Sequence, residues 1–318
     1  MFIDPKSNLK VLSEDILRLS DFFIQRPQDQ TPCSEKYCQN AYRHYFLPLN
    51  YLRNELVIRR GQEVDFFSGL QTSIDWGAGP GTASLALAQQ LQLKTQVLIE
   101  KSTLALKTFQ DLQQHLKNPV PTATLSLKKL PVRVDYDTAL LVFSYSLTEM
   151  LELPEGWDQF EALMILEPST QQDGRKLLEL RKKLQEKGYF LWAPCTHQQS
   201  CPLLEKSKND WCHDRVHVQA PSWFLDLEKY LPVKNKTITT SYLLARKTQP
   251  AFNFTGKARL TGDSLEEKGK TRQLICRGTE REFLTWMHKT IEPETLARGE
   301  LIDMPKSFEI KSNEIRVK

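Results

Sequence analysis

The sequence predicts an α/β fold: a doubly wound, mostly parallel sheet with an N-terminal helical region and a small C-terminal β subdomain. Three observations support this prediction. Short apolar runs alternate with helical stretches between Thr72 and Ala245, as in parallel sheets with helices on both faces. Residues 9–60 show the apolar spacing of helices instead. The region after Phe252 has short apolar runs broken by glycine, which favours a small β structure.

The N-terminal region is predicted to form two helical stretches separated by a polar, proline-bearing break at Arg26–Ser34. Ser13 is the expected N-cap of the first stretch. The aromatic residues of the second stretch are expected in the core, and they are Tyr42, Tyr45, Phe46 and Tyr51. An alternative is a basic, aromatic face that touches RNA, because several cations lie among these rings: Arg43, His44, Arg53, Arg59 and Arg60.

The remaining elements follow from apolar runs and their spacing. Strands are expected at 73–75, 95–99, 123–127, 139–144, 163–166, 189–193 and 237–245, the last being a late antiparallel strand. Helices are expected at 82–93, 102–116 and 174–187. Strands of the C-terminal subdomain are expected at 258–261, 272–276 and 282–286. These elements divide the chain into a helical region (1–65), a core (66–250) with a cysteine-rich insertion (194–221), and a β subdomain (251–318).

Composition limits the class of protein. The chain has 318 residues, 40% of them hydrophobic, and a net charge of +4, which permits nucleic-acid contact without requiring it. No segment is long and apolar enough for a membrane span, and the N-terminus lacks the pattern of a signal peptide. A cytoplasmic location without membrane contact is therefore expected. In that reducing compartment, clustered cysteines favour metal or redox sites over disulfides.

A glycine loop follows the first predicted strand, in the order Asp75, Gly77, Gly79 and Gly81. Glycine lets the backbone turn tightly and approach a ligand, and the N-terminus of the next helix adds free N–H donors. The Lys-Ser/Thr of a Walker phosphate loop is absent. The D-x-G-x-G-x-G spacing resembles the first motif of class I S-adenosylmethionine-dependent methyltransferases, whose fold is Rossmann-like. Glu100 ends the next strand, where that family places an acid that accepts hydrogen bonds from ribose hydroxyls. A nicotinamide dehydrogenase is the alternative, but no hydride-transfer residues are evident.

Three cysteines crowd the segment Ala193–His213: Cys195, Cys201 and Cys212. Thiolates bind zinc and iron–sulfur clusters, and this wide spacing by itself favours zinc. A fourth ligand is needed, and the candidates are His197, His213, His217 and Cys276. Cys33 and Cys38 lie apart from other cysteines and are interpreted as non-ligands.

Several segments in one order resemble the methyltransferase-like proteins associated with the mitochondrial small ribosomal subunit and their bacterial relatives. They are DWGAGPGTA, LEPST, APCTH, CPL, DWCH and ARGELID, together with the late Cys276. The resemblance implies a methyltransferase-like core, a [4Fe–4S] cluster held by Cys195, Cys201, Cys212 and Cys276, and association with small-subunit rRNA in ribosome assembly. It reverses the preference for zinc. Three positions depart from the family pattern: Ser169, Thr196 and Asp214.

Catalytic residues are not identifiable from the sequence. The segment Phe143–Met150 reads FSYSLTEM and lacks the proline-aromatic motif of amino methyltransferases, although Ser144, Tyr145, Ser146 and Glu149 are expected to line a pocket. Ser144 is included among the cofactor-binding candidates. The leading hypothesis is a methyltransferase acting on rRNA or a ribosomal protein. The alternatives are a non-catalytic rRNA-binding assembly factor and a zinc-binding RNA methyltransferase, and a further hypothesis adds a redox switch through cluster loss.

RNA rather than DNA is the expected nucleic acid. The strongest basic cluster in the C-terminal subdomain comprises Lys257, Arg259, Lys268, Lys270 and Arg272. Phosphate contacts there would make binding fall steeply with added salt. The alternative is a solvated loop, because Glu266 and Glu267 lie between the cations.

Overall fold

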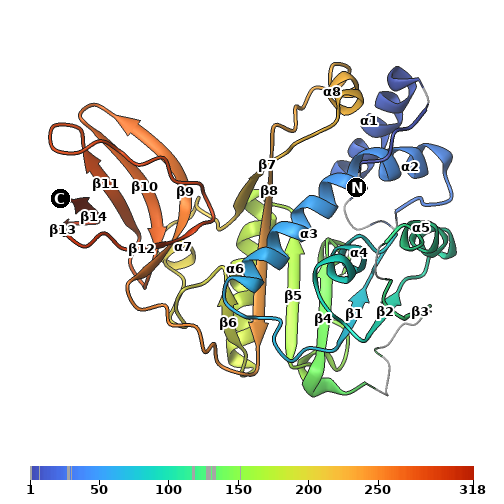
Figure 1. Cartoon of the computed structure of the whole chain (residues 1–318), viewed down its shortest axis with the longest axis horizontal. Coiled ribbons are helices and arrows are strands. Elements are labelled where there is room, and N and C mark those ends of the chain that lie inside the picture. The colour runs from blue at the N-terminus through green and yellow to red at the C-terminus, as the bar shows by residue number, and fades with distance from the viewer. Residues whose placement is uncertain are drawn as a thin grey trace. The chain divides into compact units, whose positions relative to one another are not determined.

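Figure 1 shows the computed structural model of the chain. The chain divides into two compact units. The structure describes residues 2–6, 8–26, 29, 31–116, 119–126, 130, 134–150 and 152–318. Unit 1 comprises Met1–Gln62, Phe67–Glu167 and Val216–Ile238. Unit 2 comprises Glu63–Phe66, Pro168–Arg215 and Thr239–Lys318. The division of the chain at residues 65 and 250 stays a sequence-based prediction.

Unit 1 contains a parallel sheet with the hydrogen-bonded order β3-β2-β1-β4-β5. Every residue of β5 is buried, as expected for a parallel strand covered on both faces. The order reverses between β1 and β4, so the loops that follow these strands open onto the crevice where such sheets bind ligands. The strands are β1 (Thr72–Trp76), β2 (Thr95–Ile99), β3 (Thr122–Leu125), β4 (Ala139–Ser144) and β5 (Ala162–Glu167).

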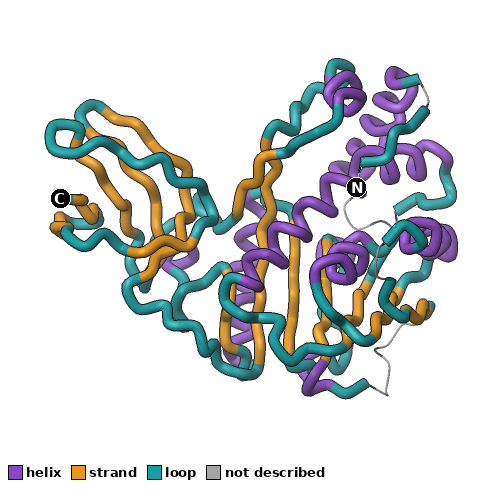
Figure 2. The backbone as a smooth tube through the Cα atoms, viewed as in Figure 1, coloured by secondary structure: helices purple, strands orange, loops and turns teal. Residues whose placement is uncertain are grey.

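The helices of unit 1 form a second core from α1, α2, α3 and α8, centred on Leu19, Tyr45 and Phe224. The residues between 36 and 62 pass through α2, a π-helical segment and α3 without a break (Figure 2). The α-helices are α1 (Leu9–Gln25), α2 (Lys36–Ala41), α3 (Leu47–Gln62), α4 (Thr82–Gln90), α5 (Thr103–Gln113) and α8 (Ser222–Glu228). The π-helix is η1 (Tyr42–Phe46), and the 3₁₀ turns are η2 (Tyr136–Thr138), η3 (Leu147–Glu149) and η4 (Trp157–Gln159).

The expected N-cap at Ser13 is wrong. Asn8 caps α1 instead, and its side chain accepts a hydrogen bond from the backbone N–H of Lys10. Ser13 is buried within the helix and donates to the carbonyl of Lys10. The hydroxyl is thereby satisfied inside the helix, an alternative to capping that serine also has.

Unit 2 contains β6 and most of β8, which pair in antiparallel fashion, and the first two residues of β7, which also pairs with β8. The two sets of strands therefore read β3-β2-β1-β4-β5 and β8-β6, which is the class I methyltransferase-like arrangement predicted from the sequence, with its late antiparallel strand. Their bounds, with the neighbouring helices, are α6 (Gln171–Glu186), β6 (Phe190–Ala193), α7 (Pro202–Glu205), β7 (Asp214–His217) and β8 (Thr237–Arg246).

The C-terminal part of unit 2 is a six-stranded sheet in the order β12-β9-β10-β11-β14-β13. Its pairs are antiparallel except β11 with β14. Trp286, Leu260 and Ile315 are buried in its core. The strands are β9 (Lys257–Glu267), β10 (Lys270–Cys276), β11 (Glu282–Met287), β12 (Leu301–Asp303), β13 (Phe308–Lys311) and β14 (Glu314–Val317).

The sequence-based elements are largely confirmed, with specific misses. The elements β7, α7 and α8 were not predicted, nor were β12, β13 and β14. The strand expected at 123–127 is β3, and its last expected residue, Leu127, lies outside the described residues. None of the described helices is both long and apolar enough to cross a membrane.

Candidate cofactor and metal sites

The glycine loop follows β1 directly, and each of its glycines has a positive φ: +69° at Gly77, +53° at Gly79 and +69° at Gly81. A Cβ at Gly77 would lie 2.8 Å from the Cβ of Ser146, and one at Gly81 would lie 2.3 Å from the Phe109 ring. At Gly79 the nearest atom is the Tyr42 hydroxyl at 4.0 Å. The backbone at Gly79 is therefore the part of the loop that a ligand can approach.

Glu100 lies beside this loop, as the motif predicts. One carboxylate oxygen accepts a hydrogen bond from the N–H of Gly79 at 2.8 Å, and the other accepts from the N–H of Ser102 at 2.7 Å. Each carboxylate oxygen has two lone pairs, so acceptor capacity remains for the hydroxyls of a ribose. Glu100 thus shapes the glycine loop and keeps the chemistry expected of a ribose-binding acid.

Asp75 is buried near the end of β1 and is bound to the helix that follows the loop. It is 1% exposed and accepts a hydrogen bond from the Ser84 hydroxyl of α4 at 2.8 Å. Burial raises the pKa of Asp75 to about 6, against hydrogen bonds from Ser84 that lower it. This geometry connects β1 to α4 and makes Asp75 a structural support of the loop.

The end of β4 supplies the other wall. The Ser144 hydroxyl accepts a hydrogen bond from the buried Asn54 amide of α3 at 3.2 Å, so Ser144 is anchored to a helix. Tyr145 has a φ of +62°. The hydroxyl of Ser146 is buried beside Gly77 and has no hydrogen-bond partner within the described part of the chain. A polar group of a bound cofactor would satisfy it, and together with the open backbone at Gly79 this fits S-adenosylmethionine.

The sequence did not indicate that the N-terminal segment reaches this region. Residues 31–34 and 101–104 line a cavity of about 440 Å³, and Thr31 donates to the Glu149 carboxylate at 3.1 Å. Burial raises the pKa of Glu149. A hydrogen bond with Cys38 lowers the pKa of Cys33, whose thiol also contacts Ser102. The aromatic residues of the second helical stretch could have indicated that the N-terminal region lies near the glycine loop. The hydroxyl of Tyr42, on the π-helix, is the nearest atom to a Cβ at Gly79.

Unit 2 brings the four predicted metal-ligating cysteines to one small cavity of about 30 Å³. Cys195 follows β6, Cys201 precedes α7, Cys212 precedes β7 and Cys276 ends β10. The rest of the lining is largely apolar, with Leu177, Leu178, Leu203 and Leu243 among its members. Within the described residues, no three His, Cys, Asp or Glu side chains have the arrangement of a formed metal site. The residues fit a thiolate-bound metal by their identity and by their shared cavity.

Burial raises the pKa of Cys212, Cys201 and Cys276, and in each case the neighbouring Cys195 raises it further. The thiols are therefore close enough to disfavour one another's ionisation. A bound cation would reverse this, because coordination to a metal deprotonates a thiol. Of the candidate histidines, His197 lies with Nε2 3.5 Å from the Cys276 sulfur, whereas His213 binds Arg298 and His217 is exposed on β7.

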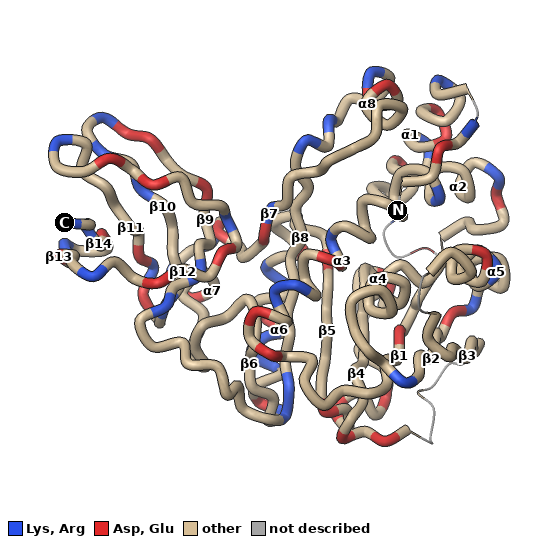
Figure 3. Tube along the Cα trace, viewed as in Figure 1, with Lys and Arg blue, Asp and Glu red and all other residues tan. Residues whose placement is uncertain are grey.

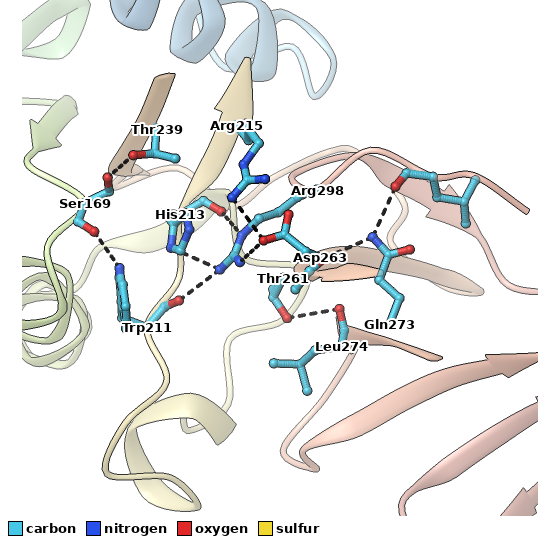
Figure 4. A network of polar contacts seen from close by, with 12 residues as sticks. Ser169, Trp211, His213, Arg215, Thr239, Thr261, Asp263, Gln273, Leu274 and Arg298 are labelled. Atoms are coloured by element: carbon cyan, nitrogen blue, oxygen red, sulfur yellow. Dashed lines mark hydrogen bonds and ion pairs between the residues drawn. The ribbon is translucent and has the colours of Figure 1, made fainter. Parts of the chain in front are cut away.

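Side chains that the sequence did not single out hold the cysteine loop in place. Arg298 donates to the carbonyl oxygens of Trp211 and His213, which flank Cys212 (Figure 4). Ser241 donates to the carbonyl of Cys212 itself. Thr196, one of the departures from the family pattern, donates to the carbonyl of Cys276 at 3.1 Å. The loop backbone is thus fixed on both sides of the thiols by hydrogen bonds.

The basic cluster expected to contact RNA is largely paired with groups of the protein itself, and for Arg259 the expectation is wrong because this side chain is buried. Arg259 is 1% exposed and donates to the carbonyls of Pro194 and Gly299. Lys270 pairs with Glu314, Arg272 with Glu267, and Lys257 with Asp303. Both cations and acids lie along β9 and β10 (Figure 3), with Asp263, Glu266 and Glu267 between Arg259 and Lys268 in the sequence.

Comparison with known proteins gives low-identity matches among solved structures. An archaeal protein of Pyrococcus horikoshii, described as an RNA methyltransferase, is 13% identical with a TM-score of 0.36, covering 62% of this chain and 83% of its own. TrmK of M. capricolum, solved with S-adenosylhomocysteine, is 12% identical with a TM-score of 0.33, covering 60% and 69%. The methyltransferase domain of a bacterial Hen1 is 12% identical with a TM-score of 0.35, covering 62% and 98%.

A search of curated proteins finds no match. The family model described as mitochondrial small ribosomal subunit Rsm22 matches residues 48–284, well over half of the chain. That range includes the glycine loop, Glu100 and all four cysteines of the cavity. The chain therefore belongs to the Rsm22 family, whose methyltransferase-like fold it shares.

Proposed function

We propose that this protein binds S-adenosylmethionine, holds a [4Fe–4S] cluster, and acts on or with small-subunit rRNA during ribosome assembly. The convergence of four thiols from separate elements on one cavity supports the cluster most strongly. The open backbone at Gly79 beside Glu100 supports the cofactor. Membership of a family described by the small ribosomal subunit supports the partner.

The proposal assigns one set of residues to the cluster and another to S-adenosylmethionine. Cys195, Cys201, Cys212 and Cys276 hold the cluster, which cross-links the loop after β6 to strand β10. The backbone of the glycine loop and Glu100 position the nucleoside end of the cofactor, and Ser146 offers a hydroxyl to it. When bound, S-adenosylmethionine supplies an electrophilic methyl group.

The metal is tested by anaerobic purification with iron, sulfide and zinc analysis and a visible absorption spectrum. About four irons and four sulfides per chain are expected for a [4Fe–4S] cluster. A content of about one zinc per chain without sulfide would favour a zinc site over the cluster. A chain with neither metal would remove this part of the proposal.

A non-catalytic assembly factor is the second candidate, favoured by the end of β4, which carries Ser144 and Tyr145 in place of a proline-aromatic motif. The variant Gly79→Asn separates the two candidates. Asparagine tolerates a positive φ, and this position has no neighbour closer than 4.0 Å, so the fold is expected to survive while the cofactor loses its approach.

Calorimetry should show that Gly79→Asn no longer binds S-adenosylmethionine. If the variant still matures small subunits as well as the unchanged chain, the protein is a scaffold. If maturation fails and the unchanged chain transfers labelled methyl groups to small-subunit particles, it is an enzyme. Binding to these particles that does not weaken with salt would contradict contact with rRNA phosphates.

A further inference from the structure

Arg181 is a buried cation whose guanidinium faces the cysteine loop. It lies on α6 and is 2% exposed. Its Nε donates to the Cys195 sulfur at 3.3 Å, and its Nη2 donates to the carbonyls of His197 and Gln199 at 3.3 and 2.6 Å. Its Nη1 donates to the Gln185 side chain at 3.0 Å. A buried arginine needs such partners, but here one of the partners is a thiol.

The hydrogen-bond partners of Arg181 differ from those of an arginine in an ion pair. Its hydrogen-bond partners are a thiol, two carbonyls and an amide, and none of them is a carboxylate. Cys195 lines one cavity with Cys201, Cys212 and Cys276, so the guanidinium of Arg181 lies beside a group of four thiols. The negative charge that would balance this cation is therefore expected from the cysteines, once they are ionised by a metal.

Arg175 provides an internal comparison on the same helix. It also donates to carbonyls of the cysteine-rich segment, namely those of Leu203, Ser207 and Asp210. The structure gives it no hydrogen bond to a sulfur among the described residues. Arg175 thus shares the role of fixing the loop with Arg181 and lacks the contact with the thiol.

We propose that Arg181 is a positioning residue of the metal site, which donates an N–H···S hydrogen bond to Cys195 and compensates the negative charge of a thiolate-bound [4Fe–4S] cluster. This inference rests on the proposed cluster. Hydrogen bonds to cluster sulfurs and nearby positive charge stabilise the reduced, more negative state, so they raise the reduction potential. Arg181 would therefore set both the potential and the retention of the cluster.

The test uses the full chain, purified anaerobically, with the variants Arg181→Gln, Arg181→Lys and Arg175→Gln. The midpoint potential is measured by titration followed in the visible spectrum, and iron release to a chelator gives a second readout. Arg181→Gln should favour the oxidised cluster about tenfold, which is about 59 mV lower for one electron. Arg181→Lys keeps the charge without the planar donor, so it should shift the potential less. Arg175→Gln should leave it unchanged.

Every outcome of these measurements either supports or overturns the inference about Arg181. A potential in Arg181→Gln equal to that of the unchanged chain overturns the inference while leaving the cluster in place. If Arg181→Gln fails to assemble a cluster, Arg181→Lys carries the test, with a lowered potential in support and an unchanged one against. Equal loss of iron from all three variants reduces Arg181 to a loop support and overturns the inference. An unchanged chain that holds no iron overturns both this inference and the proposed cluster.

Discussion

The three glycines of the loop after β1 are required for different reasons. Gly79 needs only its positive φ, whereas Gly77 and Gly81 also lack room for a side chain. The Cβ of an alanine at position 81 would overlap the Phe109 ring and approach Leu98 at 2.9 Å. Spacing alone predicted the loop, but the reason for each glycine comes from side chains that are distant in sequence.

The variant Gly81→Ala should therefore destabilise unit 1 more than Gly69→Ala. Both positions have positive φ, at +69° and +75°, but no atom lies within 4 Å of a Cβ at Gly69. We expect about 1–2 kcal/mol for the backbone strain at either site and about 1–3 kcal/mol more at Gly81 for overpacking. Urea unfolding of both variants measures the difference, and equal losses would contradict the steric argument.

Asp75 should make stability depend on pH. Its pKa rises from 3.8 to about 6 on folding, so the unfolded chain ionises first as pH increases. The contribution of Asp75 to stability is complete below pH 3.8 and is lost as the pH rises through 6. This difference corresponds to about 3 kcal/mol. In Asp75→Asn the side chain stays neutral and still accepts from Ser84, so the variant should gain stability relative to the unchanged chain between pH 4 and 6. Parallel unfolding free energies across that range would show that Asp75 does not titrate as stated.

At the scale of elements, the sequence predicted β4 and β5 well because both strands are almost continuous apolar runs. The elements between residues 202 and 228 escaped prediction because they are short: α7 has 4 residues, β7 has 4 and α8 has 7. Runs of that length show too little periodicity to separate helix from strand. The strands β12, β13 and β14 are equally short, and their pairing with distant strands, such as β12 with β9, leaves no local signal.

The candidate sites, like the secondary structure, were predicted from the sequence only in part. The glycine loop, Glu100 and three of the cysteines were singled out from residue type and spacing, whereas Cys276 was chosen as the fourth ligand on the family resemblance. Arg181 and Arg298 were not identified, because an arginine that binds backbone carbonyls has no characteristic spacing. Asp75 was expected to bind a cofactor; its contact with Ser84 was not foreseen, since a motif fixes the position of a residue but not the partners of its side chain.

Arg298 is expected to hold residues 211–213, which lead into β7, in place. Its side chain binds the carbonyls of Trp211 and His213 and also Asp263, and Arg298→Gln would remove these hydrogen bonds of the guanidinium. Hydrogen bonds to a charged donor contribute about 1.5–3 kcal/mol, and a loss of this size is expected. Lys268→Gln, an exposed site on the β9–β10 turn, is the control. Thermal unfolding and metal analysis are carried out on both variants. An Arg298→Gln chain that is as stable as the unchanged chain and fully metallated would show that the cysteine loop does not need Arg298.

At the scale of the whole molecule, metal binding should stabilise unit 2, because all four cysteines belong to it. In the proposed site, Cys276→Ser should lose the metal, while Cys33→Ser, in unit 1, should retain it. A chelator should then lower the thermal midpoint of the unchanged chain and of Cys33→Ser, and have no effect on Cys276→Ser. Retention of a full complement of iron by Cys276→Ser would exclude Cys276 as a ligand.

The order of the four thiols along the chain has a consequence for biosynthesis. Three of them leave the ribosome early, and the last waits until strand β10 has been translated. If the proposed site is right, a nascent polypeptide that stops before this strand has an incomplete donor set, and inorganic loading would belong to the final stage of production. Premature termination after β8 would then yield a product that keeps its glycine turn but lacks the fourth thiol of the proposed metal site.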